Sequence, residues 1–419
     1  MEPGRLIELA ATISDAAAHI DEFLKSRNLP YPSFEPNAPL SLPEELGDAR
    51  DAVLDGTSEL YDLLVGQVEA FVAGSSMQPG NMMSLNVIRR FDIANSFAPD
   101  EEMTFAQIAE LTGLSEVTVR HVLRHAMTLR VFREPRKGVV AHTARSVLMR
   151  NTDRANFIAV SIEEISLASL LTAEAFARWP TSEEPNQTGF SLAHGTDRSA
   201  YEILQDDPAR AVRFASAMSI FTSGKGYAAS HVVHGYDWGS LGAGSVVDIG
   251  GSRGHIAVAI ASQFPSLTFI VQDLPSTVAG AEAELPPEMA RRVTFMAHDF
   301  FESQPIVADA YFLRWIFHNW SDKYCTKLLR ALIPALRPGT RVIVNDICLP
   351  EPGSIALCKE KELRIMNLSM MSVFNARERD ADEWRDLFHR ADPRFRFVGI
   401  RQPQGSHLAL IEVEWSGQG

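Results

Sequence analysis

The stretch SVVDIGGSRG, residues 245–254, decides the fold of the C-terminal part of the chain. A short apolar strand leads directly into three glycines, and the helical run HIAVAIASQF follows at 255–264. Such a turn lets the backbone approach a ligand closely, and the helix N-terminus favours negative groups. The spacing is D-x-G-G-x-x-G, unlike the dinucleotide-binding G-x-G-x-x-G, and it lacks the Lys-Ser/Thr of a P-loop. A glycine-rich turn of this kind can also be purely structural.

Further strands are predicted on the C-terminal side of this stretch. Four short runs rich in β-branched residues alternate with helical segments: TFIVQD at 268–273, VTFMAHDF at 293–300, DAYFLRW at 309–315 and TRVIVNDICLP at 340–350. This alternation predicts a parallel α/β sheet that begins near Ser245, in a domain spanning 236–419. FRFVGIRQ at 395–402 and HLALIEVEW at 407–415 lie close together and predict a closing antiparallel hairpin. Nicotinamide domains do not usually end in this way.

Two acidic residues stand at the ends of successive predicted strands. Asp273 ends the second strand, about twenty residues after the glycines, where a carboxylate suits a ribose diol. Asp299 ends the third. Each could instead be a helix N-cap. Together with the glycine-rich turn they favour an adenosine-type ligand at the carboxyl edge of the sheet.

The N-terminal half is predicted to be helical. Residues 1–43 form an amphipathic helix, with its apolar stripe from Leu6 to Leu24, and a proline-rich connector that sets this helix apart. Within 44–150, TFAQIAELTGLSEVTVRHVLRHAMTLRVF at 104–132 has a helix-turn-helix pattern, and two short strands follow up to Thr143, which predicts a winged helix. Residues 151–235 are predicted to be a helical linker that lines the substrate site.

A winged helix suggests DNA binding, but the charge of the chain argues against it. The second helix carries only four cationic or nearly cationic groups, at Arg120, His121, Arg124 and His125, and the net charge is −14. A negative field repels phosphate backbones. We therefore expect this domain to be a scaffold that forms a homodimer, with no nucleic acid and no membrane as partner.

Cysteine usage and the first residues of the chain indicate the compartment. Only Cys325, Cys348 and Cys358 occur, without the spacing of a zinc site, so we expect no structural metal and a reducing environment. Acidic residues interrupt the first helix before any signal-peptide core or membrane span can form. The sequence predicts a cytoplasmic protein.

Six motifs, in this order, carry a family resemblance: VVDIGGSRG, IVQDLP, HDFF, FLRWIFHNWSD, VIVNDICLPEPG and FNARERDADEW. The sequence resembles the plant and fungal caffeate-type O-methyltransferases, particularly the fungal branch of secondary metabolism, from about Leu60 to Trp415. The resemblance implies a Rossmann-like domain that binds S-adenosyl-L-methionine and a winged-helix dimerisation domain. It assigns the cofactor to Asp248, Gly250, Gly251, Gly254, Asp273, Leu274, Asp299, Phe300 and Arg314.

The same resemblance implies a general base for attack by an acceptor hydroxyl. His318 matches the family's catalytic histidine, and Asp346 and Glu378 match two carboxylates that orient and polarise it. A base is needed because a phenol, with a pKa near 10, is mostly protonated at neutral pH. From the residues alone, His318 could be a structural hydrogen-bond donor and Glu378 a solvated charge. Asp346 stands where plant enzymes have Glu, and Asn367 stands where fungal ones often have Asp.

The acceptor site is less legible in the sequence. Positions that resemble lining residues suit a flat apolar acceptor, although the apolar ones suit a core equally well: His142, Phe190, Met218, Phe221 and Met371. An alternative function is that of the methyltransferase-like pericyclases in the fungal branch, which retain the methyl group. In that case the sulfonium charge with Arg314 and His142 would stabilise a polarised transition state. A DNA-binding regulator with a vestigial cofactor domain is a third alternative.

Overall fold

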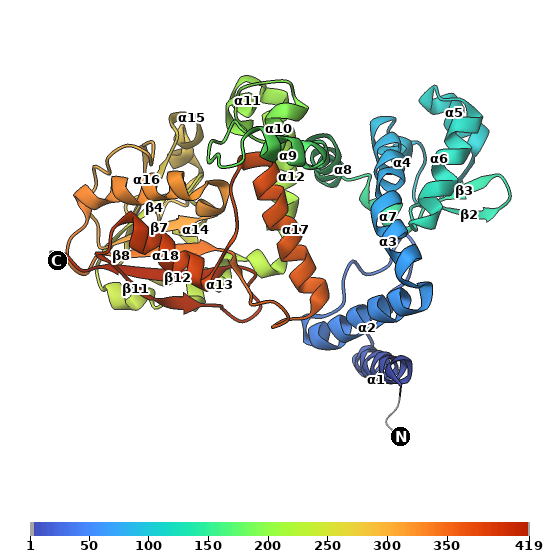
Figure 1. The fold of residues 1–419 in the computed structure, drawn as a ribbon, viewed down its shortest axis with the longest axis horizontal. Helices are drawn as coiled ribbons and strands as arrows, with labels where there is room; N and C mark the ends of the chain where they lie inside the picture. The colour runs from blue at the N-terminus through green and yellow to red at the C-terminus, as the bar shows by residue number, and fades with distance from the viewer. Residues whose placement is uncertain (1–3, 418–419) are drawn as a thin grey trace. The chain divides into compact units, whose positions relative to one another are not determined.

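The computed structural model describes residues 4–417, apart from the side chains of Ser75, Ser76 and Phe221 (Figure 1). The chain forms two compact units. Unit 1 comprises residues 1–164, 209–220 and 352–362, and unit 2 comprises 165–208, 221–351 and 363–419. The segment predicted as a linker, 151–235, is therefore divided between the two units.

Unit 2 is built on a seven-stranded sheet in the order β11-β12-β8-β7-β4-β5-β6. The strands are β4 (Ser245–Ile249), β5 (Thr268–Asp273), β6 (Val293–Ala297), β7 (Ala310–Arg314), β8 (Arg341–Asp346), β11 (Phe395–Arg401) and β12 (Ala409–Trp415). The first five are parallel, and β12 lies antiparallel to both β8 and β11. The predicted parallel α/β sheet and closing hairpin are confirmed.

Helices cover both faces of this sheet because its central strands are apolar on both sides. On one face, α16 (Asp322–Leu332) and α18 (Ala381–Ala391) contribute Leu328, Leu329 and Phe388 to the core. On the other, α13 (Ala229–Gly235) and α14 (His255–Gln263) contribute Val232, Val233 and Ile260. The result is a Rossmann-like doubly wound domain.

The strand order reverses between β4 and β7, since β5 and β6 lie on one side of β4 while β7 and β8 lie on the other. Open α/β sheets bind ligands at the carboxyl ends of the strands beside such a point. The glycine-rich loop follows β4, and the segment with His318 follows β7. Both therefore emerge at this edge of the sheet.

Unit 1 contains the predicted helix-turn-helix. α5 (Phe105–Thr112) is followed by Gly113 with a left-handed backbone, and α6 (Glu116–Thr128) is capped by the side chain of Ser115. β1 (Glu102–Thr104), β2 (Arg133–Arg136) and β3 (Val139–Ala141) form a small antiparallel sheet in the order β1-β3-β2. Their shared core includes Ile108 and Leu123.

The first helix does not sit apart, as the proline connector suggested. α1 (Arg5–Ser26) packs along α2 (Gly47–Val65), and both Leu9 and Leu24 are buried. Gly56 of α2 permits this contact, because a Cβ there would lie 3.0 Å from Ile13. The connector folds back, so the apolar stripe finds its partner within the same chain.

The remaining elements of unit 1 are helices and single turns: η1 (Glu44–Leu46), α3 (Gln67–Ser76), α4 (Gln78–Arg90), η2 (Ile93–Asn95), α7 (Ala144–Leu148) and α8 (Thr152–Val160). Those of unit 2, or shared between the units, are η3 (Ser161–Ser166), α9 (Leu167–Arg178), α10 (Gly189–Ala193), α11 (Ala200–Asp206), α12 (Pro208–Thr222), η4 (Lys225–Tyr227), η5 (Trp238–Leu241), α15 (Pro275–Val278), η6 (Ala281–Glu284), η7 (Phe317–Asn319), η8 (Ile333–Ala335), β9 (Cys348–Leu349), α17 (Leu357–Phe374) and β10 (Arg379–Asp380).

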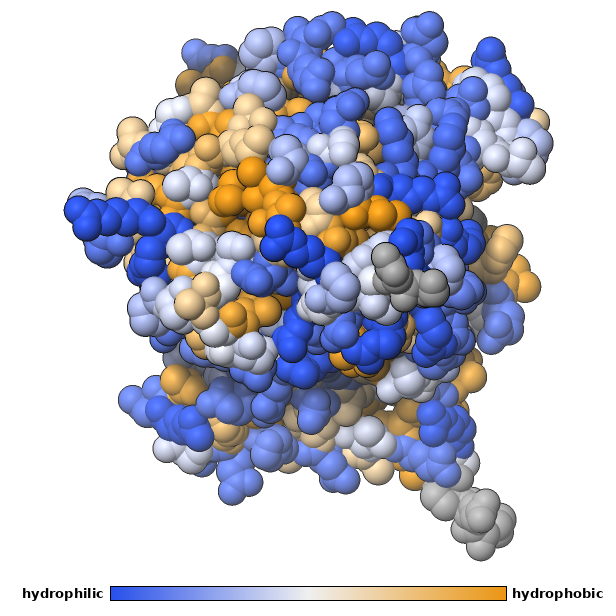
Figure 2. All heavy atoms as spheres, turned by 90° about the vertical axis from the view of Figure 1, so that its left-hand side faces the viewer, coloured by the Kyte–Doolittle hydropathy of each residue, from blue (hydrophilic) through white to orange (hydrophobic). Residues whose placement is uncertain are grey.

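One helical stretch, Thr152–Arg178, is long and apolar enough to cross a membrane by length and composition alone, and 22% of its most apolar window is buried. A single such stretch is weak evidence for a span. The face of the structure in Figure 2 is covered mainly by hydrophilic residues, with apolar patches between them.

Candidate active site

The glycine-rich loop after β4 is shaped by close contacts that only glycine permits. Gly250 has φ +69°, and a Cβ there would lie 2.4 Å from Cδ1 of Ile316. A Cβ on Gly251 would lie 2.5 Å from the carboxylate of Asp248. The loop is therefore packed closely against both the end of β4 and the segment after β7.

Asp273 lies against this loop. Its Oδ2 accepts a hydrogen bond from the backbone N–H of Ser252 at 2.9 Å, and its Oδ1 accepts one from that of Leu274 at 2.8 Å. Each carboxylate oxygen keeps a second lone pair, so the group can still accept bonds from ribose hydroxyls. Leu274 itself is 41% exposed beside it.

The loop after β6 brings the next two predicted residues to the same edge. Asp299 accepts a hydrogen bond from the backbone N–H of Phe301 at 2.9 Å. Phe300 packs edge to face against Phe301, with ring centroids 4.7 Å apart, and against Trp320 at 6.1 Å. An aromatic wall of this kind can stack on a flat ring of a ligand.

Asp248 is buried at the end of β4, and its Oδ2 has no hydrogen-bond partner among the described residues. Burial, reinforced by the nearby Asp273, raises the pKa of Asp248 to about 7, although Arg314 opposes the shift. A buried polar atom without a partner is unusual in a folded protein and often marks a place where a ligand donates.

Arg314 ends β7 and is largely buried. Its guanidinium donates to Oδ1 of Asn345 on the neighbouring strand and to the backbone carbonyl of Tyr227 at 2.6 Å. Burial lowers the pKa of Arg314, while Asp346 and Asp248 act against this shift. The residue therefore brings a fixed positive charge to the same edge of the sheet.

His318 lies in the single turn η7 and is 9% exposed. Its Nδ1 is 3.1 Å from Oε1 of Glu378. Because an ionised carboxylate can only accept, Nδ1 carries the proton, and Nε2 is left as the basic nitrogen. The ring of Trp315 lies 4.6 Å from that of His318, centroid to centroid.

Asp346 acts on the backbone of the same turn. Its Oδ2 accepts hydrogen bonds from the N–H groups of Phe317, at 3.0 Å, and His318, at 3.3 Å. The two carboxylates thus have different tasks, since Glu378 contacts the imidazole and Asp346 holds the turn. Burial alone would lower the pKa of His318, but the charges of Glu378 and Asp346 outweigh it and raise that pKa. Burial raises the pKa of Asp346 itself to about 6.

Backbone pairing brings these distant segments together. β8 ends at Asp346, and β9 just after it pairs in parallel with β10, where Cys348 is opposite Arg379. Glu378 immediately precedes β10, and its backbone N–H donates to Oδ1 of Asn367 at 2.9 Å. Asn367, which stands where fungal members of the family often have Asp, therefore holds the backbone of Glu378.

The predicted acceptor-lining residues belong to both units. Phe190 and Met371 are in unit 2 with His318, Met218 is in unit 1, and the side chain of Phe221 lies outside the described residues. His142 requires a correction. It is fully buried in the core of unit 1, where its ring packs between those of Phe97 and Phe132.

Both ring nitrogens of His142 are engaged, Nδ1 with Oγ of Ser146 at 2.9 Å and Nε2 with the carbonyl of Phe97 at 3.3 Å. Burial lowers the pKa of His142 to about 4. It is a neutral core residue and has no nitrogen left for a substrate. No local pattern predicts this burial, because Phe97 lies 45 residues before His142 in the chain.

Two residues of the site were missed by the sequence reasoning. Trp315 has a left-handed backbone, φ +57°, which is costly for a bulky residue and is found mainly where function requires it. Arg379, next to Glu378, is completely buried. In the sequence, its position directly after Glu378 in the run NARERD could have indicated that Arg379 belongs to the site.

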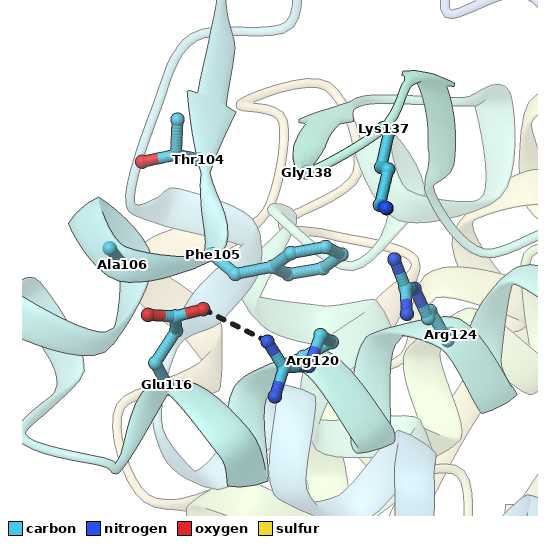
Figure 3. Close-up of a pocket in the computed structure, with 8 residues that line it drawn as sticks. All are labelled: Thr104, Phe105, Ala106, Glu116, Arg120, Arg124, Lys137 and Gly138. Carbon is cyan, nitrogen blue, oxygen red and sulfur yellow. Dashed lines mark hydrogen bonds and ion pairs between the residues drawn. The ribbon is translucent and has the colours of Figure 1, made fainter.

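A cavity of about 250 Å³ lies elsewhere, in unit 1, on the helix-turn-helix. Figure 3 shows Arg120 paired with Glu116, at 3.1 Å, and Lys137 and Arg124 pointing toward one another near the ring of Phe105. Arg124 is itself bound through two nitrogens to Glu134. This cavity contains none of the residues predicted to act on a substrate or cofactor.

Comparison with known proteins gives the site its context. Residues 177–393 match the family of O-methyltransferase domains. The chain is 41% identical over 412 residues to O-methyltransferase PaMT of Phomopsis amygdali, covering 98% of this chain and 96% of that protein. It is 40% identical over 432 residues to O-methyltransferase pyvH of Aspergillus violaceofuscus, covering both in full. The chain belongs to the O-methyltransferase family. S-adenosyl-L-methionine is the cofactor of this O-methyltransferase.

Solved structures share the fold of this O-methyltransferase. OxaC in complex with sinefungin and meleagrin superposes with a TM-score of 0.77 at 22% identity, covering 97% of this chain and 99% of that one. LepI in complex with SAM superposes with a TM-score of 0.72 at 17% identity, covering 97% and 99%. The residues at the carboxyl edge fit the cofactor, because they offer a glycine cradle and the unpartnered buried oxygen of Asp248.

Proposed function

We propose that this O-methyltransferase methylates a hydroxyl group of an aromatic or polyketide-like small molecule of secondary metabolism, with His318 as general base. The observation that carries the proposal is the contact of 3.1 Å between Nδ1 of His318 and Oε1 of Glu378 in a buried setting. It fixes the tautomer that leaves Nε2 basic, as a base oriented by a carboxylate requires.

The residues around His318 would divide the work of the reaction. When bound, S-adenosyl-L-methionine supplies a methyl group on a cationic sulfur. As the acceptor oxygen bonds to this methyl group, the bond between the methyl carbon and sulfur would break, leaving the neutral thioether of S-adenosylhomocysteine. The proton of the acceptor hydroxyl would move to Nε2 of His318. Glu378 stabilises the imidazolium that forms, and Asp346 keeps the turn in place through two backbone N–H groups. Positioned base catalysis of this kind is worth roughly 10²–10⁴-fold.

For the cofactor, we propose contacts from the nine residues at the carboxyl edge that the resemblance assigned. Asp273 would accept from the ribose hydroxyls, and Phe300 would pack on the adenine. The unpartnered oxygen of Asp248 would accept from a donor of the amino-acid part. Phe190 and Met371 remain candidates for contacts to the acceptor.

The pericyclase alternative has one observation in its favour, the shared fold with LepI. Its two proposed residues are less suited to it. His142 is held in the core of unit 1, and the guanidinium of Arg314 is already bound to Asn345 and to the Tyr227 carbonyl. We therefore favour methyl transfer.

A labelling experiment tests this choice. The enzyme is incubated with a panel of phenolic and polyketide-type acceptors and S-adenosyl-L-methionine that carries a trideuteromethyl group, and products are weighed by mass spectrometry. We expect a product that carries the label, formed in equal amount to the cofactor consumed, and a loss of ~10²-fold or more in His318→Ala. An unlabelled isomer formed with intact cofactor would overturn the proposal.

We also propose that the protein is a cytoplasmic homodimer whose unit 1 serves as a winged-helix dimerisation domain. α2 and α3 expose apolar side chains, with Leu64 66% and Val68 70% exposed in the single chain. Exposed apolar patches usually mark interaction sites. The cations of α6 are bound to Glu116 and Glu134, which argues against contacts to nucleic acid. The stretch Thr152–Arg178 also exposes apolar side chains, such as that of Leu170.

A further inference from the structure

Arg379 is fully buried in unit 2 and makes an unusual number of contacts for one side chain. Its guanidinium donates to the backbone carbonyls of Phe317, at 3.2 Å, and Trp320, at 3.0 Å. It also forms two bonds to Oδ1 of Asp322, at 3.0 and 2.8 Å, and one to Sγ of Cys325 at 3.3 Å. These partners belong to the turn η7 that carries His318 and to the start of α16.

The position of Arg379 in the sequence gives these contacts their meaning. Arg379 directly follows Glu378, so its backbone and that of the carboxylate that contacts His318 form one segment, which is fixed further by pairing with β9. The side chain then holds the carbonyl of Phe317, directly before His318, and that of Trp320, two residues after it. The segment of Glu378 and the turn of His318 are therefore joined by a second link, which does not pass through the imidazole.

Asp322 completes this link. It is bound by three arginines, Arg377, Arg379 and Arg390, but only Arg379 contacts Oδ1 and the turn. The charges of these arginines outweigh burial and hold the pKa of Asp322 far below its usual value. Asp322 is thus ionised throughout the working range and neutralises a buried guanidinium that would otherwise be costly.

We propose that Arg379, together with Asp322, is a positioning residue that sets the distance between His318 and Glu378. A guanidinium has the planar fork of donors that two carbonyls and a carboxylate require, whereas a lysine ammonium does not. The inference rests on the proposed function in one respect only, namely that His318 is the general base.

The test uses the full chain and Arg379→Lys, which keeps the charge and loses the fork. The pKa of His318 is measured by NMR on histidine labelled at Cε1, in the complex with S-adenosylhomocysteine, and the resonance is identified by its loss in His318→Gln. We expect Glu378 to separate from the imidazole, so the pKa of His318 falls by at least about half a unit, since burial then dominates. Methyl transfer to an accepted substrate should fall at least ~10-fold.

Arg390→Ala is the matched control. Arg390 binds the same carboxylate through Oδ2, but its side chain is 52% exposed and its other contact is to its own helix. We expect the pKa of His318 and the rate to remain those of the wild type. A merely structural role of Arg379 would lower the amount of folded enzyme but would not move the pKa of His318 in the folded fraction.

The outcomes separate the two proposals. If folded Arg379→Lys has the wild-type pKa and a rate within about threefold, the positioning role is wrong. If Arg379→Lys does not fold, Asp322→Asn, which keeps an acceptor for Arg379, is measured in the same way and should shift the pKa in the same direction. If Glu378→Gln retains the wild-type rate and pH profile, the proposed function fails, whatever Arg379 does.

Discussion

Replacing Glu378 with glutamine removes one charge from the centre and changes almost nothing in size. In the wild type the two atoms, Nδ1 of His318 and Oε1 of Glu378, are 3.1 Å apart. As histidine takes up the acceptor's proton, this carboxylate stabilises the new positive charge. A charge pair at this distance is worth at most about 5 kcal/mol at an effective dielectric constant of ~20. Hydrogen bonds to charged groups, measured by mutation, contribute ~1.5–3 kcal/mol.

These limits correspond to a loss between about 10-fold and a few thousand-fold in kcat, and we expect ~10²-fold. The pH dependence of kcat/KM provides a second, independent test, because the direction of its shift is predicted. The charges of Glu378 and Asp346 raise the pKa of His318 against the effect of burial. Removing one of them lowers that pKa. Since the base must be neutral, the acid limb of kcat/KM should move to lower pH in Glu378→Gln.

The assay is initial-rate formation of labelled product between pH 5 and 9, together with calorimetric binding of S-adenosylhomocysteine. Binding should change little, because Glu378 contacts the histidine and not the cofactor-binding loop. Glu362→Gln, an exposed position of α17, is the control for the chemical change itself. A Glu378→Gln enzyme with activity within about twofold and an unmoved acid limb would refute the reasoning.

Three further predictions follow from contacts described above. Asp273→Ala should weaken binding of S-adenosylhomocysteine by ~1–3 kcal/mol in calorimetry. Asp309→Ala is the control and should not weaken it, because Asp309 accepts a hydrogen bond from Ser245 at the opposite edge of the sheet; equal affinities of the two variants would reject the cofactor site. Burial lowers the pKa of His142 to about 4 in the folded chain, so as the pH falls below 6.5 this histidine takes up a proton in the unfolded chain first. Between pH 6.5 and 4, the free energy of unfolding of the wild type should therefore fall by roughly 3 kcal/mol more than that of His142→Gln in urea titrations. Parallel curves of unfolding free energy against pH would contradict this. The double variant Leu64→Glu/Val68→Glu should be a monomer in sedimentation. Leu111 is also apolar and exposed, on α5, and Leu111→Glu is the control that should stay a dimer. A dimer in both variants, or a monomeric wild type, would exclude this interface.

The strands and turns around the cofactor edge could be predicted because their signals are local. A strand such as SVVDI is apolar on both faces, and the glycines that follow it report a tight turn within ten residues. The same holds for the helix-turn-helix, where Gly113 and Ser115 mark the end of one helix and the start of the next. His318, Asp346 and Glu378 were found through the family resemblance and not through spacing.

What escaped prediction depends on contacts between distant segments. The sequence shows the apolar stripe of α1 but not that α2 covers it, and it shows His142 but not the two phenylalanines that enclose it. Arg379 looks like a surface charge because its partners Phe317 and Asp322 lie about sixty residues earlier. Burial of a charged group follows from the whole fold, so a pattern within one segment does not reveal it.

The division of the chain into units has a consequence for its synthesis and its evolution. The chain passes between the two units five times, and Asp51 of α2 is buried against Lys359, more than three hundred residues later. While the ribosome is still making the sheet, Asp51 has only its neighbour Arg50 as an ionic partner, and residues 352–362 of unit 1 are not yet made. This unit therefore cannot be completed before most of the chain has emerged. For the same reason, neither unit can be cut out as a contiguous cassette and recombined with another enzyme. An exchange of one unit between two such enzymes would have to replace several separate segments of the chain.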